Sequence, residues 1–71
     1  MRRPASKLER KFAKKLKALR GSQSQVAFAK RLGISQSTLN RLENLEQSVT
    51  LYLLEKMGDR LKLDVVDLIS D

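Results

Sequence analysis

The stretch GISQSTLNRLEN carries side chains that form hydrogen bonds well but react poorly. The polar residues of interest in it are Gln36, Ser37, Asn40, Arg41 and Asn44. None of these groups is a strong acid, a base that titrates near neutral pH, or a nucleophile with a base beside it. Amide groups both donate and accept hydrogen bonds, and a guanidinium donates through a planar fork. The pattern therefore favours recognition of a polar ligand over catalysis.

The composition of the chain lacks the groups on which most enzymes and metal sites depend. The 71 residues include no cysteine and no histidine, so the chain has no thiolate, no disulfide and none of the usual nitrogen and sulfur ligands of zinc. The acidic residues are scattered over expected caps and helix surfaces, and nothing pairs Ser35 or Ser37 with a base. We expect a protein that is not an enzyme and that holds neither a metal nor a cofactor.

Charge is distributed very unevenly along the chain. The net charge is +7, but residues 1–31 alone carry +10, with Glu9 as their single acid, whereas residues 32–71 carry −3. This asymmetry indicates that one face of the fold meets a polyanion, and it favours nucleic acid over an anionic membrane surface. The polar face of the first predicted helix lacks the aromatic residues expected of a membrane-binding helix. Simple solvation of a lysine-rich helix remains an alternative explanation of the charge.

Hydropathy gives no sign of a membrane segment. No apolar run approaches the roughly 20 residues that cross a bilayer. The two arginines near the N-terminus are not followed by a hydrophobic segment, so they do not begin a signal peptide. We expect a cytoplasmic protein with no membrane partner.

Cap residues and apolar spacing predict five short helices and no strand. We expect a flexible basic arm over residues 1–5 and a single domain over residues 6–71. The first helix should begin after Ser6, whose side chain can form a capping box with Glu9, and it should end at Gly21. Its predicted apolar face consists of Leu8, Phe12, Leu16 and Leu19.

The same signals place the four remaining helices. Ser24, Ser35, Thr50 and Asp64 are the predicted N-caps, and Gly33 can take the left-handed conformation that ends the second helix. The predicted core face of the fourth helix consists of Leu51, Leu54, Met57 and Leu61, and that of the last helix of Val65, Leu68 and Ile69. The chain is therefore expected to be an all-α bundle.

The second and third predicted helices form a tight pair joined by a turn. The residues expected to be buried between them are Phe28, Leu32, Ile34, Leu39 and Leu42, with Ala29 as a small contact. A bulky side chain at Ala29 would push the helices apart, and a β-carbon at Gly33 would disfavour the turn. The pattern predicts two short helices that cross closely.

These residues resemble the helix-turn-helix of the XRE-type family, the phage repressor and Cro-like regulators. The resemblance covers roughly residues 8–69, is strongest over SQVAFAKRLGISQSTLNRLEN, and departs from the family pattern at Lys62, where the family often has glycine. It implies a compact five-helix, lambda-repressor-like domain that binds double-stranded DNA. A nucleoid-associated protein is expected.

The resemblance and the helical spacing together assign the candidate DNA contacts. With about 100° between successive residues, burial of Leu39 and Leu42 turns the polar side chains outward, where a helix fits the major groove. The candidate base-reading residues are Gln36, Ser37, Asn40 and Arg41. The candidate phosphate-binding residues are Ser24, Gln25, Ser35 and Asn44.

Several of these assignments have structural alternatives. Ser24 and Gln25 can act as helix caps only, and Asn44 suits a helix C-cap. Arg41 can instead be an ion-pair partner on the surface, with Glu43 or Glu46. In the family a glutamate at the place of Glu43 often binds a basic residue of the first helix, and the candidates here are Arg20 and Lys17.

The family resemblance leaves more than one function open. The leading interpretation is a sequence-specific transcriptional repressor that binds a palindromic operator as a homodimer. The alternatives are an antitoxin that neutralises a cognate toxin and regulates its own gene, or a restriction-modification controller. Val65, Val66 and Ile69 form a possible dimer interface, unless they simply complete the core.

Overall fold

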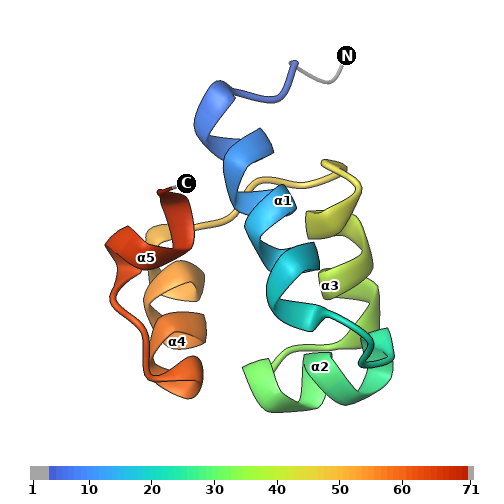
Figure 1. Cartoon of the computed structure of the whole chain (residues 1–71). Helices are drawn as coiled ribbons and strands as arrows, with labels where there is room; N and C mark the ends of the chain where they lie inside the picture. The colour runs from blue at the N-terminus through green and yellow to red at the C-terminus, as the bar shows by residue number, and fades with distance from the viewer. Residues whose placement is uncertain (1–3, 71) are drawn as a thin grey trace.

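Five helices make up the described part of the chain, residues 4–70 of a computed structural model (Figure 1). They are α1 (Lys7–Arg20), α2 (Gln25–Leu32), α3 (Gln36–Glu43), α4 (Leu51–Leu61) and α5 (Val65–Ile69), with no strand between residues 4 and 70. The prediction of an all-α fold is confirmed. Residues 1–3 of the predicted arm lie outside the described residues, and Ala5 O accepts a hydrogen bond from Arg10 Nη1 at 2.8 Å.

Side-chain caps begin four of the helices where the sequence predicts them. Ser6 and Glu9 form the capping box, with hydrogen bonds of 2.8 and 3.0 Å. The hydroxyls of Ser24, Ser35 and Thr50 accept from the backbone three residues further on. Each such cap stabilises a helix by about 1 kcal/mol. Asp64 occupies the cap position of α5, but its side chain makes no capping hydrogen bond.

Left-handed residues end or directly follow α2, α3 and α4, and only one of the three is a glycine. Gly33 ends α2 with φ 75° and ψ 28°, as predicted, and its N–H donates to Ala29 O and Lys30 O. Lys62 ends α4 in the same region, with φ 59°. Leu45, just after α3, also has a positive φ of 60°. Lysine and leucine therefore stand at two positions where glycine would fit without strain.

The core receives side chains from all five helices. Its fully buried members are Leu16, Phe28, Leu32, Leu39, Met57 and Leu68. The prediction was wrong for Leu8 and Leu51, which are 57% and 84% exposed. Both lie in the first turn of their helices. Figure 1 shows the first turns of α1 extending beyond the other helices, so no neighbour covers Leu8 there.

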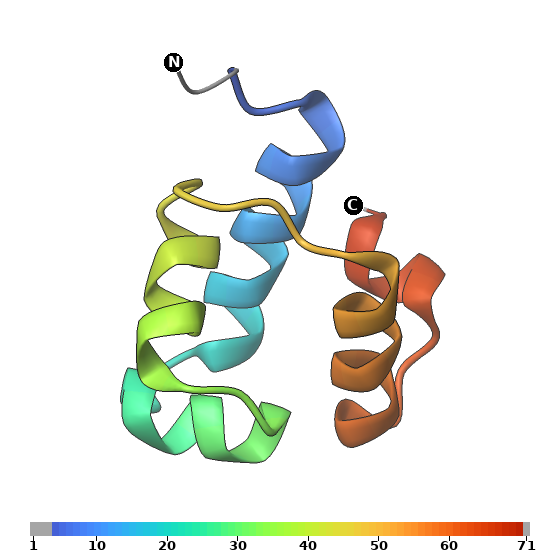
Figure 2. The same cartoon turned by 180° about the vertical axis from the view of Figure 1, so that it is seen from behind.

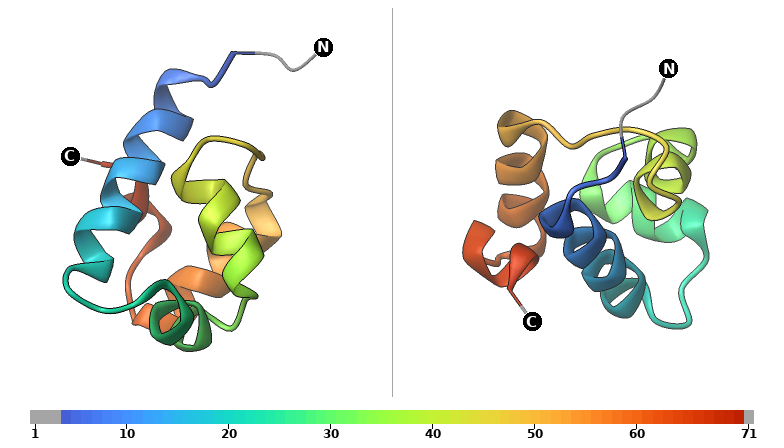
Figure 3. Two further views of the ribbon diagram at one scale, coloured as in Figure 1. Left: turned by 90° about the vertical axis from the view of Figure 1, so that its right-hand side faces the viewer. Right: turned by 90° about the horizontal axis from the view of Figure 1, so that it is seen from above.

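The packing of the helices leaves one side of α3 uncovered. α2 and α3 pack against each other, α1 contacts α3 and α5, and α4 contacts α2 and α5, as the reverse view shows (Figure 2). In the left view of Figure 3, α3 lies at the front of the molecule with no other helix before it. The bundle therefore supports α3 from behind and presents its outer side.

Candidate nucleic-acid interface

The outer side of α3 gathers all four candidate base-reading residues. Leu39 and Leu42 are 0% and 3% exposed, and they fix the inward side of the helix. A surface hollow of about 330 Å³ is lined by Gln36, Ser37, Asn40, Arg41 and Glu46. The first four are exposed on the helix itself, and Glu46 follows it in the chain. A ligand at this hollow meets amide, hydroxyl, guanidinium and carboxylate groups at once.

A two-pronged ion pair fastens α3 to α1 behind this surface. Arg20 Nε lies 2.9 Å from Glu43 Oε2, and Arg20 Nη2 lies 3.1 Å from Glu43 Oε1. Arg20 is thus the partner of Glu43, whereas Lys17, the other candidate, is exposed. Bidentate arginine–carboxylate pairs are directional, so they fix orientation as well as distance. The pair sets the position of α3 relative to α1.

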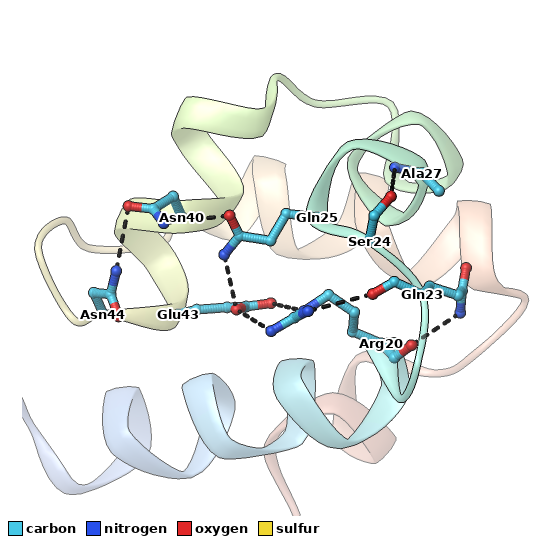
Figure 4. Close-up of polar contacts among 8 residues, drawn as sticks. All are labelled: Arg20, Gln23, Ser24, Gln25, Ala27, Asn40, Glu43 and Asn44. Atoms are coloured by element: carbon cyan, nitrogen blue, oxygen red, sulfur yellow. Dashed lines mark hydrogen bonds and ion pairs between the residues drawn. The ribbon is translucent and has the colours of Figure 1, made fainter.

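A chain of hydrogen bonds leads from Glu43 to the surface (Figure 4). Gln25 Nε2 donates to Glu43 Oε1 at 3.1 Å, Asn40 Nδ2 donates to Gln25 Oε1 at 3.3 Å, and Asn44 Nδ2 donates to Asn40 Oδ1 at 3.2 Å. A carboxylate can only accept, so Gln25 must turn its amino group inward and its carbonyl toward Asn40. We call this chain of four residues the amide relay. It gives each amide side chain a defined orientation.

The two serine candidates are engaged as helix caps. Ser24 Oγ accepts from Ala27 N–H at 3.1 Å. Ser35 Oγ accepts from Thr38 N–H at 3.1 Å, and the Ser35 hydroxyl donates to Thr38 Oγ1 at 2.9 Å. Both serines therefore act as the N-caps that the sequence predicts. The N-termini of α2 and α3, which these serines cap, carry the partial positive charge that attracts an anion.

Arg41 has a partner that the sequence did not suggest. Its Nη1 donates to Gln47 Oε1 at 3.3 Å, whereas Glu43 is bound by Arg20. The sequence analysis considered Glu46 only as an ion-pair partner of Arg41 and did not consider Gln47, because both residues follow the helix and their placement depends on the positive φ of Leu45. Leucine carries no sequence signal for that conformation.

A residue of α4 supports the turn between α2 and α3. Arg60 Nε donates to Arg31 O at 3.1 Å, and Arg60 Nη2 donates to Lys30 O at 3.2 Å. Both carbonyls belong to the C-terminal turn of α2, where Lys30 O also accepts from Gly33 N–H at 3.2 Å, so Arg60 adds partners at the end of the helix. A β-carbon at Gly33 would lie 3.4 Å from the Arg60 side chain. Arg60 thus holds the turn in place from behind.

No described helix is long and apolar enough to cross a membrane. Between residues 4 and 70 there is also no group of three or more potential metal ligands.

The geometry is that of a helix-turn-helix protein, and comparison with known families agrees. The helix-turn-helix family model matches residues 14–68, from the middle of α1 into α5. The chain belongs to the XRE-type helix-turn-helix family of DNA-binding regulators, which includes the phage repressor and Cro-like proteins. No curated protein and no solved structure matches the chain significantly.

Proposed function

We propose that this DNA-binding regulator is a transcriptional repressor that binds a palindromic operator as a homodimer, on nucleoid DNA in the cytoplasm. The observation that carries the proposal is the polar hollow on the uncovered side of α3. An α-helix presented in this way fits the major groove, where each base pair has its own pattern of donors and acceptors. The rigid attachment of α3 to α1 through Arg20 and Glu43 supports a precise docking geometry.

The proposed base contacts follow from the chemistry of the exposed side chains. Gln36 can pair its amide with the N6 and N7 positions of adenine, and Arg41 can pair its fork with the O6 and N7 positions of guanine. Ser37 and Asn40 line the same hollow and supply further hydrogen bonds. Binding of Arg41 to guanine requires only the release of its 3.3 Å hydrogen bond to Gln47.

The proposed phosphate contacts flank the reading helix. Ser24 and Gln25 lie at the N-terminus of α2, Ser35 at that of α3, and Asn44 at the end of the amide relay. Gln25 uses one amino hydrogen on Glu43, so the second is available for a phosphate oxygen. The lysines of α1 add a general attraction to the DNA phosphates.

We also propose that residues 6–71 form one domain and that residues 1–5 form a basic arm.

Homodimer formation is proposed because one helix reads only a few base pairs. Val66 is 65% exposed, whereas Val65 and Ile69 are half-buried against the core. Val66 therefore offers the free apolar surface of the proposed interface, with Val65 and Ile69 behind it. A patch on α5 that pairs with itself would produce a closed two-fold dimer.

A second candidate function is that of an antitoxin. The observation in its favour is that Leu51 and Tyr52, at the start of α4, are 84% and 76% exposed. Adjacent exposed apolar side chains suit a protein partner. Co-expression with a toxin encoded beside this gene would distinguish the two: a repressor leaves the toxin active, and an antitoxin neutralises it.

The experiment that tests the leading proposal is selection of bound sequences from a random pool of duplex DNA. We expect two inverted half-sites with centres about 10 base pairs apart, or a multiple of that spacing. Enrichment of a single unrepeated site would contradict the dimer. Absence of any enriched sequence would contradict sequence-specific regulation.

A further inference from the structure

The loop after α3 turns back through a conformation that leucine rarely adopts. Leu45 has a φ of 60°, in the region where a β-carbon crowds the following carbonyl oxygen. Two backbone hydrogen bonds hold the reversal: Leu45 N–H donates to Leu42 O at 3.3 Å, and Glu46 N–H donates to Arg41 O at 2.8 Å. Strained residues persist where the surroundings require them, and they gather at functional sites. The residue that this reversal places is Glu46.

Glu46 lines the same hollow as the four proposed base-reading residues. It is exposed, and its side chain makes no hydrogen bond or ion pair with any other residue between positions 4 and 70. The nearby guanidinium of Arg41 donates to Gln47 instead. The carboxylate of Glu46 is therefore open to a ligand that occupies the hollow.

A carboxylate in this position opposes general attraction to DNA. The phosphates repel it, and the chain otherwise relies on a net charge of +7. A group that weakens binding to every sequence can still improve recognition if it favours one base over the rest. Discrimination between bases is thus the role that the chemistry of Glu46 suits.

The major groove distinguishes one base for an acceptor of this kind. A carboxylate only accepts hydrogen bonds, and cytosine presents only a donor there, the N4 amino group. Guanine presents two acceptors, thymine presents the O4 acceptor, and adenine places its N7 acceptor beside its N6 donor. A carboxylate therefore matches cytosine and meets a repulsive acceptor at each other base.

We propose that Glu46 is a specificity-determining residue that accepts a hydrogen bond from cytosine N4 in the major groove. This inference rests on the proposed function, because it requires α3 to enter the groove. Arg41 lines the same hollow and donates to guanine. Arg41 and Glu46 together therefore read guanine through a donor fork and cytosine through an acceptor.

The test compares Glu46→Gln and Glu46→Ala with the control Glu55→Gln. Glu55 is exposed on α4 and lines a different hollow with Tyr52 and Asp59, so its replacement removes one negative charge away from the site. Each full-length chain is used to select duplexes from the random pool. Its affinity is then measured for the selected site and for the three other bases at the cytosine position.

We expect the unmodified chain and Glu55→Gln to prefer cytosine at one position of each half-site. Glu46→Ala should lose about tenfold of that preference, and Glu46→Gln should shift it toward adenine, which an amide can contact at two atoms. Both Glu46 variants should bind unrelated duplex DNA more tightly.

Two results would overturn the inference while leaving the proposed function intact. In the first, the Glu46 variants select the original half-site with unchanged preference at every position. In the second, they bind all sequences more tightly by the same factor, which shows general repulsion alone. If the unmodified chain selects no sequence, the proposed function and this inference both fail.

Discussion

Arg20 and Glu43 connect the end of α1 to the end of α3 through contacts of 2.9 and 3.1 Å. Only 2% of the Glu43 side chain and 26% of the Arg20 side chain are exposed. Removal of two charges from water costs much of what their attraction contributes, so a buried pair adds little net stability. Its effect is geometric, because the same carboxylate holds Gln25 and begins the amide relay.

Loss of Arg20 should therefore destabilise the fold more than the pair stabilises it. Arg20→Met leaves the Glu43 charge buried without an opposing charge, held only by the hydrogen bond from Gln25, and should lower the free energy of unfolding by about 3 kcal/mol in urea denaturation. The double variant Arg20→Met/Glu43→Leu should recover most of that loss, because no unpaired charge remains. It should still bind DNA weakly, since Gln25 has lost its acceptor. Full affinity in the double variant would show that the relay is dispensable.

The base-reading proposal predicts losses confined to particular base pairs. Gln36→Ala should leave stability nearly unchanged, because Gln36 is exposed, but it should cost about 1 to 3 kcal/mol of binding free energy on the specific site. Arg41→Lys keeps the charge but loses the planar fork, so general attraction should survive while discrimination falls. Affinities measured on a panel of single-base operator variants check both. Unchanged preferences in both variants would mean that α3 is not the reading helix.

Phosphate contacts predict a strong dependence on salt. If the dimer makes about 6 to 10 such contacts, affinity should fall by about 10³ to 10⁵ between about 50 and 200 mM salt. Lys14 and Lys17 are exposed on α1, and replacing either with alanine should weaken binding to all sequences equally if it touches a phosphate. The logarithmic salt slope should then fall by about 0.9. If the sequence preference changes instead, the replaced lysine contacts a base and not a phosphate.

The proposed dimer surface can be separated from the core by two substitutions on α5. Val66 is 65% exposed and Leu68 is 0% exposed. Val66→Lys should give a folded monomer in sedimentation, because only the interface loses apolar contact. Leu68→Lys is the matched control and should unfold the chain, since it places a charge in the core. A dimer that persists in Val66→Lys would move the interface elsewhere, for example to Leu51.

Helix boundaries could be predicted because their signals are local. The N-cap serines and Gly33 act through bonds to residues three or four positions away, and the structure has them as expected. The partner of Glu43 was narrowed to Arg20 or Lys17 by the family resemblance, which implies a basic residue of the first helix at this place. The choice between Arg20 and Lys17 needed the actual crossing of α1 and α3.

Other features depend on where neighbouring helices stop, and periodicity does not contain that information. Leu8 and Leu51 share the angular position of core residues but lie at helix ends that nothing covers. The left-handed conformation of Leu45 is similarly unpredictable, because leucine disfavours it, whereas at Lys62 the glycine that the family often has there points to such a conformation. The left-handed conformation of Leu45 is what places Glu46 in the hollow.

Lys62 offers a direct measure of the strain that such an exception stores. Its φ is 59° and its ψ is 42°, and a residue with a β-carbon pays about 1 kcal/mol or more in this region relative to glycine. Lys62→Gly removes that strain but also removes a charge, whereas Lys62→Ala removes the same charge and keeps the β-carbon. The free energy of unfolding of the glycine variant should therefore be higher than that of the alanine variant by about 1 kcal/mol. The greater freedom of glycine in the unfolded chain should reduce this difference by a few tenths of a kcal/mol. Urea denaturation of both variants isolates the backbone contribution, and equal stabilities would mean that Lys62 adopts the left-handed conformation without significant cost.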